Sequence, residues 1–120
     1  MPDGRVTDMS KPTVGFVVIY RWKLHAGMER QFQQAWERAT PLLMRHRGAL
    51  GSRLHKSADG TWIAYAQWPN RHSWELSRAL PAVDPEASRQ MLEAEAESYP
   101  PILLAPVADF LGHHEILRES

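Results

Sequence analysis

Alternating apolar side chains predict a β-strand in the segment TVGFVVIYRWKLH, which is rich in β-branched and aromatic residues. Because Val17 and Ile19 are apolar like their neighbours, we expect the first half of this strand to be buried on both faces. A single layer of helices covers one face of a sheet, so a second surface must cover the other. One face carries Phe16, Val18, Tyr20, Trp22 and Leu24, and the other carries Val17, Ile19, Arg21 and Lys23.

A helical period follows in the segment AGMERQFQQAWERATPLLMRHRG. Phe32 and Trp36 belong to its apolar face, and we expect both side chains in the core. Pro41 lies inside the pattern and is expected to kink or interrupt the helix near Thr40. Gly48 is typical of a residue that ends a helix.

A β-hairpin is predicted for ALGSRLHKSADGTWIAYAQW, because two strand-like runs flank a turn at Asp59-Gly60. In the second strand, Trp62 and Trp68 lie on one face with small alanines between them. Two large rings separated by small side chains leave a shallow trough in which a flat ligand could stack. Ordinary core packing is the alternative role for these two tryptophans.

Arg53 and His55 share a face of the first hairpin strand. Together they supply a fixed cation and a group that can carry a proton near neutral pH. Their alternative role is that of solvated polar residues on a half-exposed strand. The adjacent His113 and His114 would point to opposite faces of a strand and make a poor metal site. Because no metal, flavin or phosphate-loop motif is present, the sequence predicts neither a metal nor a cofactor.

The second half of the chain is predicted to hold two helices and a last strand. A short helix that contains Trp74 follows a break at Pro69-Asn70, where an asparagine is common for local reasons. The next helix begins after its N-cap, Asp84, and is expected to continue to Ser98. The segment ILLAPVADFLGHHEIL supplies the last strand, at a sheet edge because it contains a proline.

The predicted order is β-α-β-β-α-β with one extra helical piece. This is the ferredoxin-like split βαβ arrangement of the α+β class, with an antiparallel sheet. Residues 1–12 are expected to be a flexible leader, and residues 13–120 a single domain. Pairing the open sheet faces of two copies is the simplest way to cover them, so a homodimer is predicted.

Composition removes several classes of function. The chain has no cysteine, which excludes a disulfide framework and a thiolate site. Its 14 basic and 14 acidic residues balance without a long block of either sign, so neither a nucleic-acid nor a membrane partner is predicted. The N-terminus lacks the apolar core of a signal peptide, and we expect a cytoplasmic protein with a small aromatic ligand.

The chain resembles the antibiotic biosynthesis monooxygenase family over about residues 14–111, in the segments FVVIYRWKLHAGMERQFQQAW, GALGSRLH and GTWIAYAQWPNRHSW. The resemblance implies a homodimer in which two sheets pack into a dimeric α+β barrel. It also implies a pocket in each subunit, between the sheet and the helices. Some relatives oxygenate polycyclic phenols without a metal or flavin, others cleave haem, and many have no known activity.

Haem cleavage is not predicted for this chain. Relatives that cleave haem carry an Asn on the first strand, and a Trp and a His around the second helical region. Here Tyr20 takes the place of that Asn, and Trp74 falls earlier than the family's Trp, which aligns near Ser77. No His follows Trp74 before His113.

Two hypotheses of different classes remain. The first is a cofactor-independent monooxygenase that acts on an electron-rich aromatic such as a phenol or hydroquinone. The second is a non-catalytic dimeric protein that binds a small molecule or acts in stress. Under the first, Tyr20 orients the substrate oxygen, Arg53 stabilises the phenolate and His55 moves the proton. The predicted substrate-binding residues are Trp22, Trp62, Trp68, Trp74 and Asn70.

Overall fold

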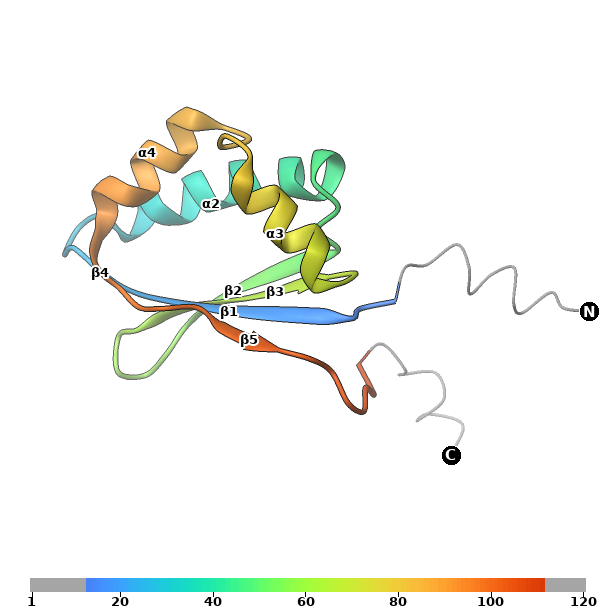
Figure 1. Cartoon of the computed structure of the whole chain (residues 1–120). Helices are drawn as coiled ribbons and strands as arrows, with labels where there is room; N and C mark the ends of the chain where they lie inside the picture. The colour runs from blue at the N-terminus through green and yellow to red at the C-terminus, as the bar shows by residue number, and fades with distance from the viewer. Residues whose placement is uncertain (1–12, 112–120) are drawn as a thin grey trace, which may run out of the picture.

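Between residues 13 and 111 of the computed structural model, five strands form one antiparallel sheet, and three helices cover one of its faces (Figure 1). The structure describes residues 13–111, so the predicted leader and His113-His114 lie outside it. This arrangement confirms the predicted α+β, ferredoxin-like fold. In chain order the elements are β1 (Phe16–Leu24), α2 (Glu29–His46), β2 (Gly51–Lys56), β3 (Trp62–Trp68), α3 (Arg71–Ala79), α4 (Pro85–Ala94), β4 (Glu95–Ser98) and β5 (Ile102–Leu104).

The strands lie in the order β2-β3-β1-β4, and β5 also pairs with β1. The strand β4 pairs with β1 at Trp22–Leu24, and β5 pairs with it at Val17–Ile19. The expected last strand is thus present as the short β5, and a further short strand, β4, precedes it on the same edge of β1. Pro100 and Pro101 separate them, because proline has no N–H to donate to a ladder.

The expected helix up to Ser98 is wrong in its last turn. The helix α4 ends at Ala94, and the next four residues form β4 instead. Glu97 lies opposite Lys23, and Ser98 lies opposite Trp22. Pairing with the free edge of β1 overrides the helical preference of this Ala- and Glu-containing segment, because tertiary contacts outweigh intrinsic propensity. The predicted start is confirmed, because the Asp84 carboxylate accepts a hydrogen bond from the N–H of Ala87 at 2.9 Å.

Of the kink or interruption expected near Thr40, the interruption is wrong, because α2 continues through Pro41 to His46. Pro41 is exposed, and its ring removes only one backbone donor from a helix that is anchored by buried Phe32. The helix ends where predicted. Gly48 adopts a positive φ of 86°, and the N–H of Ala49 reaches back to the carbonyl of Leu43 at 3.3 Å.

The register of the strands decides which side chains face the helices. Tyr20 lies opposite Ala64, and Trp22 lies opposite Trp62, so these four side chains share one face. We call this the helix-covered face, and the other the outer face. The helix-covered face carries Phe16, Val18, Tyr20, Trp22, Ser52, Leu54, Trp62, Ala64, Ala66 and Trp68. The outer face carries Val17, Ile19, Arg21, Lys23, Arg53, His55, Ile63, Tyr65 and Gln67.

The core lies between the helix-covered face and the helices, in two aromatic clusters. Under α2, the fully buried Phe32 ring meets Trp22 edge-on, with ring centroids 4.8 Å apart. Under α3, Trp74 packs against Phe16 at 5.5 Å. Tilted and edge-on ring pairs of this kind stabilise the core beyond the burial of their apolar surface.

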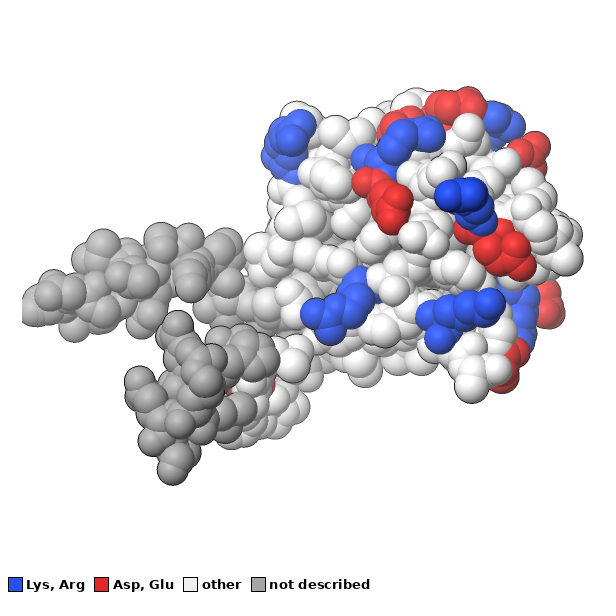
Figure 2. Space-filling view, turned by 180° about the vertical axis from the view of Figure 1, so that it is seen from behind, with Lys and Arg blue, Asp and Glu red and all other residues white. Residues whose placement is uncertain are grey.

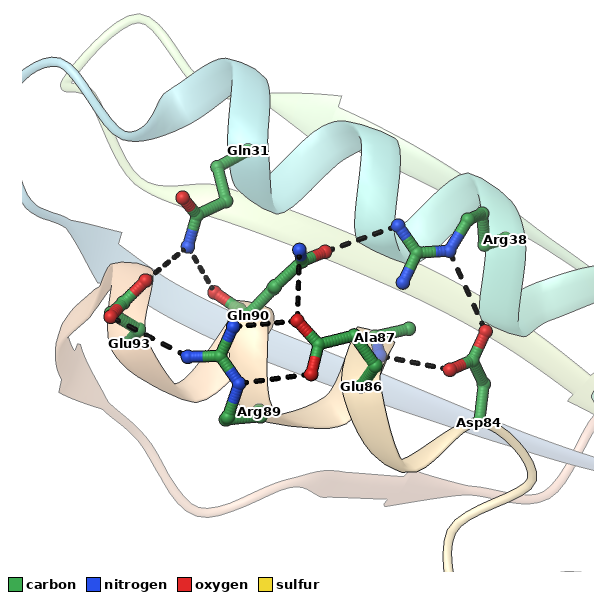
Figure 3. A network of polar contacts seen from close by, with 8 residues as sticks. All are labelled: Gln31, Arg38, Asp84, Glu86, Ala87, Arg89, Gln90 and Glu93. Carbon is green, nitrogen blue, oxygen red and sulfur yellow. Dashed lines mark hydrogen bonds and ion pairs between the residues drawn. The ribbon is translucent and has the colours of Figure 1, made fainter.

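Polar side chains join α4 to α2 along their exposed seam (Figure 3). The Gln31 amide donates to the backbone carbonyl of Gln90 at 3.0 Å and to Glu93 at 2.8 Å. Arg38 donates to the Gln90 side chain at 3.1 Å and pairs with Asp84 at 3.5 Å. The seam therefore fixes the segment before α4 as well as the helix itself.

Figure 2 shows acidic and basic side chains interspersed over the helical layer, with no large patch of one sign on that face.

Candidate functional site

A pocket of about 440 Å³ lies between the helix-covered face, α2, α3 and the segment before α4. The small side chains of Ser52, Ala64 and Ala66 form its floor on β2 and β3. Because these residues project so little, the sheet leaves room that larger side chains would fill. The rings that border this space are Tyr20, Trp22, Trp36, Trp68 and Trp74.

The Tyr20 hydroxyl is a polar group among the aromatic rings of this site. It accepts a hydrogen bond of 2.8 Å from Nε1 of Trp74, a buried residue of α3. Burial raises the pKa of Tyr20, whereas the Trp74 hydrogen bond and the positive charge of Arg78 act in the opposite direction. Tyr20 therefore keeps its proton at neutral pH. Since its oxygen already accepts from Trp74, the O–H is left to donate to a ligand.

Two arginines also line the pocket, but they have different surroundings. Arg47 donates to the backbone carbonyls of Ser77, at 3.2 Å, and Pro81, at 2.6 Å. It thereby holds the C-terminal end of α3, where carbonyl groups favour a cation. The Arg78 guanidinium lies over the Trp74 ring, 4.7 Å from its centroid.

Four of the predicted site residues meet in this pocket: Tyr20, Trp22, Trp68 and Trp74. The predicted trough over the alanines is present, but its far wall is Trp22 rather than Trp62. Trp62 instead packs against Phe32 at 6.3 Å, beneath the ammonium group of Lys56 at 5.9 Å. It borders a second cavity of about 440 Å³ beside the edge strand β2.

The structure does not bring Arg53 and His55 together with Tyr20. Arg53 lies opposite Tyr65, and His55 opposite Ile63, so both belong to the outer face. Both residues are exposed, and Nδ1 of His55 lies 3.3 Å from the carbonyl oxygen of Ile63. Within the described chain, Arg53 and His55 therefore do not line the pocket that contains Tyr20, but they border the second cavity together with Trp62. The period of two along a strand separates both residues from Tyr20.

Asn70 lies outside the pocket and has a local role. Its side-chain oxygen accepts a hydrogen bond of 2.8 Å from the N–H of Ser73, which makes it the N-cap of α3. The cap starts the helix that carries Trp74 and Arg78 to the pocket.

The sequence reasoning did not place several lining residues in the pocket, among them Trp36, Arg47 and Arg78. Trp36 follows the buried Phe32 by one helical turn and was therefore expected in the core. In the structure it is half-buried and lines the pocket. Arg78 follows Trp74 by four residues, which places both on one helix face. That spacing was the available signal. Nothing in the sequence marks Arg47, because its partners lie on α3 and beyond it.

A model of the antibiotic biosynthesis monooxygenase family matches residues 15–85, more than half of the chain. The chain belongs to this family. No curated protein sequence matches it.

Solved structures of similar fold include family relatives. One is SnoaB, a cofactor-independent oxygenase from Streptomyces nogalater, with a TM-score of 0.68 and 14% identity, covering 82% of this chain and 99% of that one. Another is a Bordetella bronchiseptica protein named as a candidate antibiotic biosynthesis monooxygenase, with a TM-score of 0.69 and 22% identity, covering 80% and 100%. A third is a dimeric ferredoxin-like protein from an uncultured marine organism, with a TM-score of 0.65 and 7% identity, covering 84% and 95%. At these identities the likeness concerns the fold.

Two further observations describe this antibiotic biosynthesis monooxygenase family member between residues 13 and 111. Within that range, no helix is both long enough and apolar enough to span a membrane. The same range holds no cluster of three or more His, Asp or Glu side chains that could bind a metal ion.

Proposed function

We propose that this family member is a monooxygenase that binds a flat phenol or hydroquinone in the pocket and oxidises it with O₂. The observation that carries the proposal is the Tyr20 hydroxyl, held by Trp74 inside a site bordered by aromatic rings. A volume of about 440 Å³ is within the range of about 300–1,000 Å³ that small-molecule sites occupy. The family match and the cofactor-independent oxygenase of similar fold also support this chemistry.

The ligand ring lies over Ala64 and Ala66, with Trp68 and Trp22 at the two ends of the floor. Aromatic rings favour offset or edge contacts with one another, so these borders select a flat ligand over a bulky one. The Tyr20 O–H donates to the phenolic oxygen of the ligand. One hydrogen bond at one end of an apolar slot fixes both the position and the direction of the ring.

The reaction balances without an external reductant. The phenol loses its O–H proton, and the electron-rich ring donates electrons to O₂ and forms a C–O bond at a carbon that carries hydrogen. That carbon then loses its proton while the O–O bond breaks. One oxygen atom stays in the product as a carbonyl and the other leaves in water, so a phenol and O₂ give a quinone and water. The protein binds the phenol, excludes solvent and orients it.

We also propose a homodimer that forms through the outer face. The central side chains of that face are apolar, and the helices of the described chain all lie on the opposite side of the sheet (Figure 1). Ile19 and Tyr65 lie opposite each other there, and Ile102 and Leu104 extend the apolar surface along β5. A solved relative by fold is dimeric, which supports this arrangement. Arg53 and His55 would then lie at the subunit interface instead of in the pocket.

Oxygen uptake by the purified protein tests the activity, with a panel of phenols and hydroquinones that differ in the number of fused rings. We expect one O₂ consumed for each quinone formed. Tyr20→Phe should reduce the rate by about 10²-fold, because the substrate oxygen loses its orienting donor. Tyr65→Phe is the matched control, since it removes the same hydroxyl from the outer face and should retain the rate.

Calorimetric binding of the same panel separates the two hypotheses. Binding accompanied by oxygen uptake supports the monooxygenase. Binding of these phenols without any oxygen uptake contradicts the proposed activity and favours the non-catalytic binding protein. Haem cleavage stays a negative prediction, because Tyr20 stands where relatives that cleave haem carry an Asn.

A further inference from the structure

Arg78 is a pocket cation whose guanidinium group has no acidic partner among residues 13–111. It comes from the last turn of α3 and lies over the Trp74 ring, at 4.7 Å from the centroid. The other face of its guanidinium group and its N–H donors remain available to a ligand. We propose that Arg78 makes this pocket selective for aromatic ligands that carry an anionic oxygen group, such as a phenolate or a carboxylate. The inference rests on the proposed aromatic pocket and names the charge of its ligand.

The position of Arg78 relative to Tyr20 locates the anion. Nε1 of Trp74 donates to the Tyr20 oxygen at 2.8 Å, and the same indole carries the Arg78 guanidinium on its face. The positive charge of Arg78 also lowers the pKa of Tyr20, against the larger effect of burial. A ligand oxygen that accepts the Tyr20 O–H therefore lies in the field of a cation. An oxygen anion gains from both groups, whereas a neutral oxygen gains mainly from the O–H.

The other charged groups of the pocket do not cancel this field. Asp84 is the only carboxylate among the lining residues that the structure describes, and it pairs with Arg38 at 3.5 Å. It also accepts the Ala87 N–H at 2.9 Å. Arg47 adds a second positive charge, although two of its donors are engaged by backbone carbonyls. Among the described residues, the largely apolar pocket thus has a net positive charge, and Arg78 is its cation without a hydrogen-bonded partner.

Selection of an anion fits the proposed chemistry. An ionised phenol donates electrons to O₂ more readily than the neutral phenol, so a cation beside the oxygen favours the reactive form. Arg78 acts on the charge of the bound ligand and is a specificity-determining residue. Its contribution should shrink with added salt, because the side chain is exposed on one side.

Two probes of the same shape test the inference by calorimetry, namely 2-naphthoate, which is an anion, and 2-naphthamide, which is neutral. We expect the wild type to bind the anion at least about 10-fold more tightly. Arg78→Gln should reduce this ratio to within about 3-fold, chiefly by weakening the naphthoate, and Arg78→Lys should retain part of it. Arg30→Gln is the control, because it removes one exposed positive charge from α2 outside the pocket.

A second readout uses 4-nitrophenol, whose ionisation is visible by absorbance. Bound to the wild type, it should titrate with a lower pKa than in water, and Arg78→Gln should abolish that shift. Equal affinity of the wild type for both naphthyl probes, or an unchanged ratio in Arg78→Gln, would overturn the inference while leaving an aromatic pocket. Failure of both probes to bind would overturn the inference and the proposed pocket together. Selective, Arg78-dependent binding without oxygen uptake would uphold the inference and contradict the monooxygenase activity alone.

Discussion

The two faces of the sheet are built from the same strands, but one face borders the pocket and the other carries an apolar surface that no described helix covers (Figure 1). On the helix-covered face, large rings alternate with Ala64 and Ala66, and the space between them is a pocket. On the outer face, Ile19 and Tyr65 form an apolar centre, with Arg53 directly beside Tyr65 on β2 and further cationic residues along β1. Since neighbouring residues in a strand point to opposite sides, every residue of β1 and β3 takes part in only one of these surfaces. Only every second residue of β1 and β3 can therefore contribute a side chain to the pocket.

The difference shows how each face is covered. The rings on the helix-covered face find partners inside the chain, as Trp22 does with Phe32. The outer face has no helix over it, so its apolar side chains need a surface from outside the described chain. We therefore expect the first face to determine the stability of one subunit, and the second to determine the proposed association. Mutations on the two faces should separate these properties.

The largest expected effect on subunit stability comes from Phe32→Ala. The side chain is fully buried between α2 and Trp22, and its loss should lower the free energy of unfolding by about 3–5 kcal/mol. Urea unfolding at several protein concentrations measures this value. The exposed Leu76 of α3 provides the control, since Leu76→Ala should change the same quantity by less than about 0.5 kcal/mol. Similar losses for both variants would contradict the position of the core.

On the outer face, Tyr65→Glu should affect association more than folding. A new carboxylate beside Ile19 is tolerated in water but not at an apolar interface. We expect the dissociation constant of the homodimer to rise about 100-fold, which corresponds to about 2.7 kcal/mol. Analytical ultracentrifugation measures it, with Leu76→Glu as a control on a helix surface. A wild type that sediments only as a monomer at micromolar concentration would rule out the homodimer.

A smaller effect is expected at Asn70, which connects β3 to the helix above the pocket. Asn70→Ala removes the acceptor for the Ser73 N–H and should cost about 1 kcal/mol of stability, measured by thermal or urea unfolding. Asn70→Asp keeps an oxygen acceptor and should restore the stability. If Asn70→Asp folds normally but loses affinity for phenols, the side chain also contacts the ligand. Unchanged stability in Asn70→Ala would contradict the capping role.

The smallest effect concerns the turn that sets the register of β2 and β3. Hydrogen bonds from the N–H of Thr61 and the hydroxyl of Ser57 lower the pKa of Asp59 to about 2. Because the folded pKa is below the unfolded value of about 3.9, the carboxylate stabilises the fold at higher pH. This contribution is lost as the pH falls from about 4 through about 2.

Asp59→Asn should reduce that pH dependence, because an amide oxygen keeps the hydrogen bonds without titrating. The measurement is the difference in urea midpoint between about pH 5 and about pH 2, which should be smaller in the variant than in the wild type. Asp109→Asn is a control carboxylate outside the turn. An equal difference in wild type and Asp59→Asn would show that the turn does not contribute.

The sequence by itself determined β1, the β2-β3 hairpin and the helix that begins at Asp84, because each depends on a local period, turn or cap, and the order of these elements indicated the fold class. It also determined that Tyr20 and Trp22 share one face, and that Trp62 and Trp68 share one, since a strand has a fixed period of two. It could not determine how the strands face one another. That relation placed Arg53 and His55 on the outer face and left Trp62 outside the main pocket.

Only the tertiary structure decided the rest. The last turn predicted for α4 became β4, because β1 offered a free edge that local propensity does not register. The Tyr20 and Trp74 side chains are 54 residues apart in the chain, and their hydrogen bond exists because α3 packs over β1. Arg78 reached the pocket on the same helix. A local period depends only on residues that are near one another in the sequence, whereas a binding site depends on contacts between elements that are distant in sequence.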